Sequence, residues 1–479
     1  MTVEDRDLAF TPAYKIRELI GRKEVSVLEI TKLYLERIAT LDPELNAFIT
    51  VAEEHALEAA KAAESAVMEG KALGVLHGVP VSIKDLAATK GIRTTKGSLA
   101  YEHFVPDEDD LFVARLREAG AIIIGKTNTP EFGEGGGVTE NNLKPNCNNP
   151  WNPLMTSGAS SGGAAASVPS GLNPIAHGSD GAGSIRIPSA FCGVYGIMAT
   201  QGRVPRREKG LMSWNPVDFS RDGPISRNVR DAALFLNVVS GPHREARQGT
   251  MQDTPPDFLS GLDDGIKGLR VAWTPNLGSV PVDPEVRAIS EDGFRGLIEL
   301  GAEFSDDIFE IDVESLHRTL VSLRGPASYA NNSHLINEWG AKMMPYISEA
   351  IELGGQVTGI EYAQALAELE KHRSYVRNYF RKVDLLITPA VSVTAFKGSE
   401  RPNLIDGKSI DPMSGWYGHN YPFNMSGNPA ASVPCGFASN GMPVGIQIVA
   451  EVGKENLVLQ ASAAFEKARP WEHLRPRIS

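Results

Sequence analysis

The chain has 479 residues, of which 42% are hydrophobic and 22% charged, an ordinary composition for a globular protein with a large buried core. Its net charge of −12 argues against nucleic acid as a partner, because a nucleic-acid surface needs clustered basic residues. Three cysteines form neither a disulfide framework nor a metal-ligand pattern, and no apolar stretch approaches the roughly 20 residues that cross a bilayer, so we expect a cytoplasmic protein with no membrane contact.

The first segment is predicted to be helical. Residues 25–41 carry apolar side chains at helical spacing after Ser26, a suitable N-cap, and Asp42-Pro43 is expected to end this helix. Residues 52–69 are rich in Ala and Glu and predict a second amphipathic helix.

Short apolar runs then alternate with helical patterns, which is typical of an α/β sheet with helices on its faces. The predicted strands are 79–83, 121–125, 268–273, 384–388 and 443–450, and the predicted helices are 112–118, 231–239, 284–300 and 456–468. No internal repeat or long linker divides the chain. We therefore expect a single domain over 1–479, with a helical segment at about 10–70, a catalytic core at about 75–240 and a variable region at about 305–425.

The stretch from 128 to 190 is crowded with Gly, Ser, Asn and Pro. It contains TSGASSGG at 156–163 and GSDGAGSIRIP at 178–188. Glycine permits positive φ and close approach of the backbone, so such a loop can aim N–H groups at an anion or a developing oxyanion. We interpret this stretch as the site of the chemistry rather than as a flexible linker.

Other chemistries compete for the same residues. The pattern G-x-S-x-G over 158–162 would make Ser160 the nucleophile of an α/β-hydrolase, which also needs a later acid and histidine. The candidate histidines have no telling context: His334, His372, His419 and His473. No Lys-Ser or Lys-Thr follows the glycines, as a P-loop requires, and no H-x-x-x-H pair supports a zinc hydrolase.

Taken together, the motifs closely resemble the amidase signature family. The resemblance rests on GASSGG and GSDGAGSIRIPSAFCGVYG and on further segments in order along nearly the whole chain: HGVPVSIKD (77–85), GKTNTPEFG (125–133), NNPWNP (148–153), DGPISRNVRD (222–231), PVGIQIVA (443–450) and AFEKARPW (464–471). It implies an α/β/α sandwich with a large mixed β-sheet, formed by one amidase signature domain.

The resemblance also implies a Ser–cisSer–Lys triad, with Ser184 as nucleophile, Ser160 as the bridging serine and Lys84 as the base. The peptide bond before the bridging serine, Ala159–Ser160, is then cis, and Ser161 is expected to help orient Lys84. Elementary chemistry agrees with these roles, since a serine needs a base and burial lowers the pKa of a lysine that would otherwise be protonated at pH 7.

The oxyanion hole would be formed by backbone N–H groups of four consecutive residues: Gly181, Ala182, Gly183 and Ser184. Asp180 and Arg186 flank this loop and are interpreted as a structural clamp that supports it. Neither a cofactor nor a metal ion is expected for this mechanism.

This sequence departs from the family pattern at three places. Ala159 and Ala182 replace common glycines, and Met198-Ala199 stands where Lys-Pro is usual. No triad member is lost, so the departures bear on substrate preference rather than on hydrolysis.

The expected reaction is cleavage of the C–N bond of small hydrophobic or aryl amides, with carbamate (urethane) and ester hydrolysis as further activities. Aromatic and methionine side chains in the region without predicted elements suit an apolar pocket, or else belong to the core: Tyr329, Trp339, Met343, Met344, Tyr346, Trp416 and Tyr417. The alternative is an amidotransferase subunit that works on misacylated tRNA with partner chains. The oligomeric state is open, and a homodimer is compatible with the sequence.

A last expectation concerns a basic run. Arg203, Arg206, Arg207 and Lys209 are interrupted by Glu208, and the run is predicted to be a solvated loop rather than a phosphate site.

Overall fold

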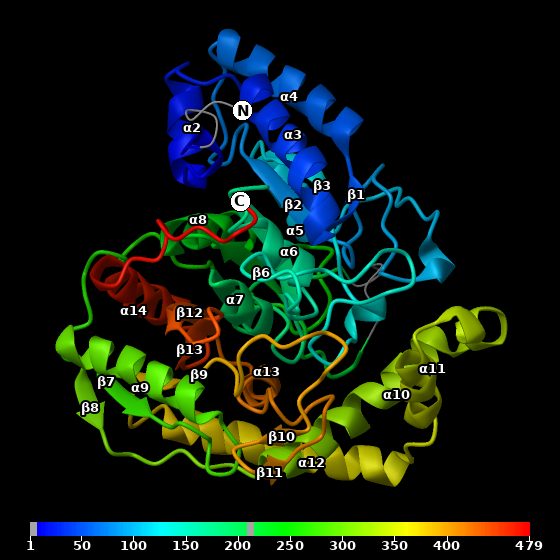
Figure 1. Ribbon diagram of the computed structural model, residues 1–479, viewed down its shortest axis with the longest axis vertical. Helices are drawn as coiled ribbons and strands as arrows, with labels where there is room; N and C mark the ends of the chain where they lie inside the picture. Colours follow the sequence, from blue (N-terminus) through cyan, green and yellow to red (C-terminus); the bar gives the residue numbers. More distant parts are fainter. Residues whose placement is uncertain (1–6, 208–214) are drawn as a thin grey trace.

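The computed structural model describes residues 7–207 and 215–479, and its centre is one large mixed β-sheet (Figure 1). Eleven strands form it in the order β1-β3-β2-β4-β6-β5-β12-β13-β9-β7-β8. Pairs β2–β3, β2–β4, β7–β8 and β7–β9 are parallel, and the other pairs are antiparallel. The predicted α/β sandwich with a mixed sheet is confirmed.

The strands of this sheet come from most of the chain. They are β1 (Phe48–Val51), β2 (Pro80–Lys84), β3 (Ile122–Thr127), β4 (Ile175–Asp180), β5 (Tyr195–Met198), β6 (Arg221–Ser226), β7 (Arg270–Trp273), β8 (Glu303–Ser305), β9 (Leu385–Pro389), β12 (Ala430–Phe437) and β13 (Pro443–Ala450). A separate two-stranded ribbon pairs β10 (Leu404–Ile405) with β11 (Lys408–Ser409).

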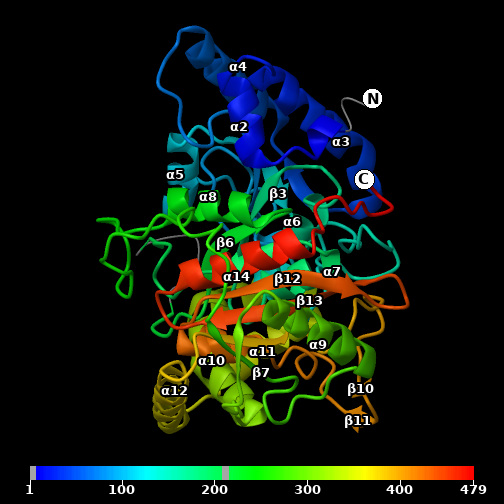
Figure 2. The ribbon, with the colours of Figure 1, turned by 90° about the vertical axis from the view of Figure 1, so that its left-hand side faces the viewer.

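Helices cover both faces of the sheet. On the face shown in Figure 2 lie α8 (Val229–Val239), α14 (Glu455–Ala468) and α9 (Pro284–Glu299), which contact one another or the central strands. The other face carries α6 (Gly162–Ser167) and α7 (Arg186–Cys192). Successive residues of β13 face opposite helix layers. Gly445 lies near Ala190 of α7, and Ile446 lies near Gly293 of α9. This alternation is the period-two geometry of a strand buried on both faces.

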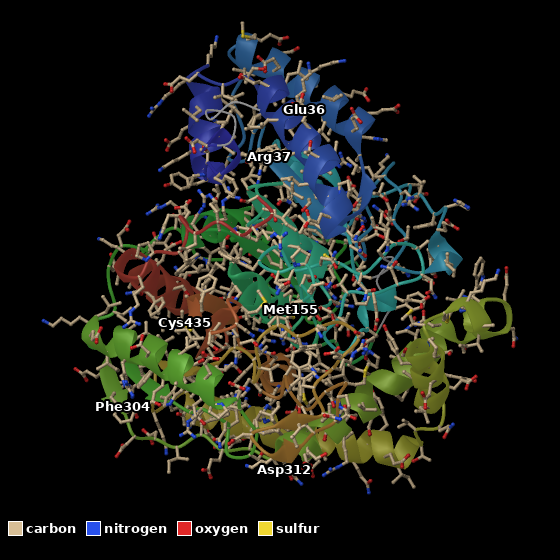
Figure 3. The ribbon with its side chains drawn as sticks, viewed as in Figure 1. Glu36, Arg37, Met155, Phe304, Asp312 and Cys435 are labelled. Atoms are coloured by element: carbon tan, nitrogen blue, oxygen red, sulfur yellow. The ribbon has the colours of Figure 1, made fainter. Side chains whose placement is uncertain are left out.

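The N-terminal helices α2 (Ala13–Gly21), α3 (Val27–Leu45) and α4 (Glu53–Met68) form one end of the molecule. Ser26 caps α3 with a full capping box, as its sequence predicts. The predicted stop at Asp42-Pro43 is wrong, because α3 continues to Leu45 and the Asp42 carboxylate instead accepts N–H groups of the next segment. Glu36 and Arg37 of α3 are labelled in Figure 3. Buried Arg37 donates to the carbonyls of Ser170 and Gly171, which lie between α6 and β4.

The region without predicted elements forms a helical arm. It consists of α10 (Val313–Trp339), α11 (Pro345–Gly354) and α12 (Gly359–Tyr379), with α11 at the outer tip in Figure 1. Shorter helices complete the fold: α5 (Leu111–Glu118), α13 (Tyr421–Ser426) and the 3₁₀ turns η1 (Leu99–Tyr101), η2 (Glu131–Gly133) and η3 (Gly340–Lys342). Among the described residues, no helix has the length and apolarity needed to span a membrane.

Candidate active site

The end of strand β2 carries Lys84 into the interior. All five residues of β2 are buried, and the Lys84 side chain has no exposed surface. Its Nζ donates to Ser160 Oγ at 2.7 Å and to the Ser179 carbonyl at 3.2 Å. The lysine and the bridging serine predicted from the sequence are therefore in direct contact.

The surroundings of Lys84 change its proton affinity. Burial lowers its pKa to about 7, although the negative charges of Asp180 and Asp222 act in the opposite direction. Burial has the larger effect on the pKa because the charged ammonium loses its hydration shell in the interior. A large fraction of Lys84 is then neutral near pH 7, the state in which its Nζ lone pair can accept a proton.

Ser160 and Ser161 immediately precede α6. The peptide bond between Ala159 and Ser160 is cis, as the family resemblance implies. Ser161 Oγ donates to the Ser179 carbonyl at 3.2 Å, so it shares this acceptor with Lys84. Its backbone N–H donates to the carbonyl of Ser184 at 3.1 Å, which brings the two Gly/Ser segments together.

The loop between β4 and α7 carries Ser184 and the four predicted oxyanion donors. Gly183 has φ +116°, and a Cβ there would come within 2.7 Å of Asn420 and Ile187, so only glycine fits. Its N–H donates to Asp180 Oδ1 at 2.6 Å. No described residue accepts from the N–H groups of Gly181, Ala182 or Ser184. Three of the four predicted donors are thus free, and that of Gly183 is engaged.

Asp180 and Arg186 hold this loop from inside. Both are fully buried, with Arg186 Nε 2.9 Å from Asp180 Oδ2, and Asn424 of α13 donates to Asp180 Oδ1 at 2.9 Å. Arg186 Nη1 donates to Gln447 Oε1 at 2.6 Å. Burial alone would raise the pKa of Asp180, but the Arg186 charge and these hydrogen bonds hold it well below its usual range. The ion pair joins the end of β4 to the start of α7, and the role of these two residues as a clamp stays a prediction.

The histidines considered for an α/β-hydrolase are engaged elsewhere or exposed. His372 Nε2 lies 2.8 Å from the Pro422 carbonyl, and His419 Nε2 lies 2.9 Å from that of Pro275. Both His334 and His473 are exposed. The histidine that does lie beside Lys84 is His177, which was not predicted although it directly precedes the GSDGAGS motif.

The prediction of a solvated basic loop is wrong for its first members. Arg203 and Arg206 are buried, because carboxylates neutralise them in the interior: Glu455 lies 3.2 Å from Arg203 Nε and Asp222 lies 2.7 Å from Arg206 Nε. Glu208 and Lys209 lie outside the described residues.

Two of the predicted aromatic and methionine residues, Trp416 and Met343, lie in different apolar clusters. Trp416 is buried in the core, stacked on Phe191 with a centroid distance of 5.7 Å. Met343 belongs to a small cluster of the helical arm against which Phe132 packs. Phe132 is followed by Gly133, where a Cβ would lie 3.5 Å from Ser160 Oγ. The arm therefore reaches the segment beside the bridging serine.

A mixed sheet that buries a lysine against a serine, next to a glycine-rich loop with free N–H groups, is the arrangement expected of an amide-hydrolysing enzyme of the amidase class. The amidase family model matches residues 29–459. The chain is 34% identical to the acylamidase of Rhodococcus erythropolis over 480 residues, covering 99% of both chains. It is also 35% identical to a glutamyl-tRNA(Gln) amidotransferase subunit of Synechococcus sp. (strain JA-3-3Ab), covering 96% of this chain and 92% of that one.

Solved structures agree with the sequence relatives. A bacterial aryl acylamidase of the amidase signature family superposes with a TM-score of 0.91 at 32% identity, covering 96% of this chain and 97% of that one. A 6-aminohexanoate cyclic dimer hydrolase superposes with a TM-score of 0.86 at 29% identity, covering 98% and 99%. The chain belongs to the amidase signature family and is an amidase.

Proposed function

We propose that this enzyme hydrolyses small hydrophobic or aryl amides through Lys84, Ser160 and Ser184. The observation that carries the proposal is the contact between buried Lys84 Nζ and Ser160 Oγ at 2.7 Å. A buried amine whose pKa is about 7 can take a proton and return it within one catalytic cycle at neutral pH.

In the proposed reaction Ser184 Oγ attacks the carbonyl carbon. Its proton passes to Ser160, whose own proton passes to Lys84, and the free N–H groups of the loop stabilise the oxyanion. Collapse of the tetrahedral intermediate breaks the C–N bond, and the proton returns from Lys84 through Ser160 to the leaving nitrogen. Water then hydrolyses the acyl-enzyme along the same proton path, releasing the acid and restoring Ser184.

Two observations support a hydrophobic acyl or aryl group as the substrate. The apolar cluster around Met343 continues through Phe132 to the segment beside Ser160. The relatives include an acylamidase, and the superposed structures include an aryl acylamidase. Carbamates and esters are proposed as further substrates, because the triad and the loop recognise only a carbonyl group. A cytoplasmic location remains part of the proposal.

A second candidate function is that of an amidotransferase subunit. It is favoured by the 35% identity to the glutamyl-tRNA(Gln) amidotransferase subunit of Synechococcus sp.. That candidate predicts low amidase activity for the isolated chain, whereas our proposal predicts turnover without any partner chain.

Covalent labelling with a fluorophosphonate tests the nucleophile. We expect Ser184→Ala to abolish labelling and turnover, and Ser160→Ala to retain a small residue of both. Ser189→Ala is the matched control, since this buried hydroxyl of α7 lies in the same segment and contacts no hydrogen-bond partner among the described residues. Loss of labelling in Ser160→Ala alone, with Ser184→Ala still labelled, would support the α/β-hydrolase alternative instead.

Lys84→Ala tests the base with the same assays. Amide hydrolysis should fall by several orders of magnitude, and ester hydrolysis should fall less, because an amine leaving group needs a proton and an alkoxide needs it less. Equal losses for a matched amide and ester would contradict the proposed role of Lys84 as proton donor.

A further inference from the structure

A chain of buried polar groups leads from Lys84 to Arg206. The Lys84 backbone N–H donates to His177 Nδ1 at 3.3 Å. His177 Nε2 lies 3.0 Å from Asp222 Oδ1, and Arg206 Nε donates to Asp222 Oδ2 at 2.7 Å. His177, Asp222 and Arg206 are 1%, 4% and 8% exposed, so the chain is shielded from water along its length.

These contacts fix the protonation of His177. Because Nδ1 accepts the Lys84 N–H, the ring proton lies on Nε2, which donates to the Asp222 carboxylate. Burial lowers the pKa of His177, although Asp222 opposes this effect, and the neutral tautomer follows. Phe112 stacks on the imidazole with a centroid distance of 4.1 Å and holds its plane.

The imidazole takes the place of a strand partner. β2 pairs with β4 at Val81 and Ser82, and two residues further along the Lys84 N–H is bound by the His177 side chain instead of a β4 carbonyl. A buried backbone N–H needs an acceptor, so His177 determines where the end of β2 lies. The direction of the Lys84 side chain toward Ser160 depends on that placement.

We propose that His177, Asp222 and Arg206 form a positioning network that holds Lys84 toward Ser160 and balances the charge around it. The inference rests on the proposed function, in which Lys84 is the base, since it assigns a role to the buried residues that contact Lys84 or one another next to it. None of the three residues is placed in contact with the substrate. They act through Lys84.

The two charged members of the network act on Lys84 in opposite directions. Burial has the largest effect and lowers the pKa of Lys84; Asp222 opposes this effect by raising the pKa, and Arg206 adds to it by lowering the pKa further. The other charged or titratable groups near Lys84 are left unchanged when only Asp222 or Arg206 is substituted: Asp180, Glu134, His177, and Asp85 and Lys126 at the ends of β2 and β3. Removing Asp222 or Arg206 should therefore shift the protonation of Lys84 with opposite signs.

The rate of fluorophosphonate labelling of the purified full chain between pH 5 and 9 measures this shift without knowledge of the substrate. Labelling requires neutral Lys84, so the labelling rate should fall toward acid pH with a midpoint near pH 7 in the wild type. Asp222→Asn should move the midpoint to lower pH and Arg206→Gln to higher pH, each by roughly half a unit or more. Asp222→Glu keeps the charge and should restore the wild-type midpoint.

The positioning role is tested at His177. His177→Leu removes the acceptor for the Lys84 N–H and should lower the plateau rate of labelling by roughly ten- to a hundredfold, because small displacements of a catalytic group have effects of that size. His177→Asn keeps an acceptor near the position of Nδ1 and should recover most of this loss. Thermal unfolding of each variant shows whether the fold is retained.

The outcomes separate this inference from the proposed function. Midpoints that shift in the same direction in Asp222→Asn and Arg206→Gln, or that do not shift, would overturn the network. Equal plateau losses in His177→Leu and His177→Asn would do the same. If Asp222→Asn does not fold, the upward shift in Arg206→Gln decides. A wild-type chain that takes no label at Ser184 would instead refute the proposed function itself.

Discussion

Lys84 combines two demands that conflict in one side chain. A protonated amine is stable in water, but this one is buried, with Ser160 Oγ and the Ser179 carbonyl as its partners. The protein therefore stabilises a neutral or readily deprotonated amine. This costs folding free energy at every pH at which the amine would be protonated in the unfolded chain. The residue that we propose as the catalytic base should therefore be among the less favourable ones for stability.

Lys84→Met should increase the stability of the protein while abolishing amide hydrolysis. The pKa of Lys84 is about 7 in the folded chain and near 10.5 when unfolded, so its cost is full below pH 7, declines as the pH rises, and is gone above about 10.5. We expect a gain on the order of a few kcal/mol at pH 6 and almost none near pH 10.5.

Chemical denaturation at both pH values measures the Lys84→Met gain. The exposed Lys371 on α12 supplies the control, since Lys371→Met should change little at either pH. A gain that is the same at pH 6 and pH 10.5 would show that titration of Lys84 is not its cause.

At the scale of elements, the connection from β4 to α7 depends on partners that arrive from distant parts of the chain. Asp180 ends β4, Arg186 begins α7, and Asn424 of α13 and Gln447 of β13 bind them from the other side. The loop geometry that leaves three N–H groups free thus depends on these tertiary contacts as well as on the glycine at position 183.

Asp180→Asn should destabilise the protein by about 3–5 kcal/mol, because it leaves the buried Arg186 charge without its counter-ion. The pKa of Asp180 is depressed in the folded chain, so its contribution is full above its ordinary value of 3.8 and is lost as the pH falls below it. The stability difference between wild type and variant should therefore shrink in acid.

Urea denaturation at pH 7 and pH 3 provides the comparison for Asp180→Asn. Asp263→Asn, in the exposed pair with Arg230, is the matched control and should cost less than about 1 kcal/mol. A difference that persists unchanged at pH 3 would rule out the ion pair as its source.

The predicted elements succeeded where the sequence pattern is strong. The limits of β13 match the prediction at both ends, and α9 and α14 each differ from it by one residue at one end. The helices of the arm were not predicted. In α12 the buried stripe includes a histidine, His372, and Ile360 and Leu366 are exposed, so the contrast between the two faces is weak.

The residues of the site likewise divide into those that the sequence predicted and those that it did not. Lys84 and Ser160 were identified from motifs and do meet in the fold, whereas His177, Asp222 and Arg206 were not identified as a group. Their contacts span three segments, and only the pairing of β4 with β6 brings His177 and Asp222 together. No local pattern in the sequence encodes that meeting.

At the scale of the whole molecule, the helical arm contacts the η2 turn, which lies beside Ser160. The Met344 N–H of the arm donates to Glu131 Oε2 at 2.7 Å, and Glu131 lies two residues before Gly133. In the proposed function, the arm would therefore form part of the wall that faces the substrate.

The arm leads us to expect a preference for apolar amides. An anilide should have a higher kcat/KM than its matched phenyl carbamate or a primary amide such as asparagine, and esters should react faster than the less electrophilic carbamates. Assays of these substrates with the purified chain alone test whether apolar amides are preferred. A preference of tenfold or more for the small polar amide, equal to about 1.4 kcal/mol of transition-state binding, would contradict the apolar wall.

The distance in sequence between Arg186 and its partner Asn420 has a consequence for how the enzyme is made. They lie 234 residues apart, so a ribosome that adds about 5–20 residues per second needs roughly 10–50 seconds to supply Asn420 after Arg186. During that interval Arg186, which supports the loop that carries Ser184, lacks its acceptor on Asn420. We therefore expect the nascent chain to be unreactive, and reactivity to appear only once synthesis is nearly finished.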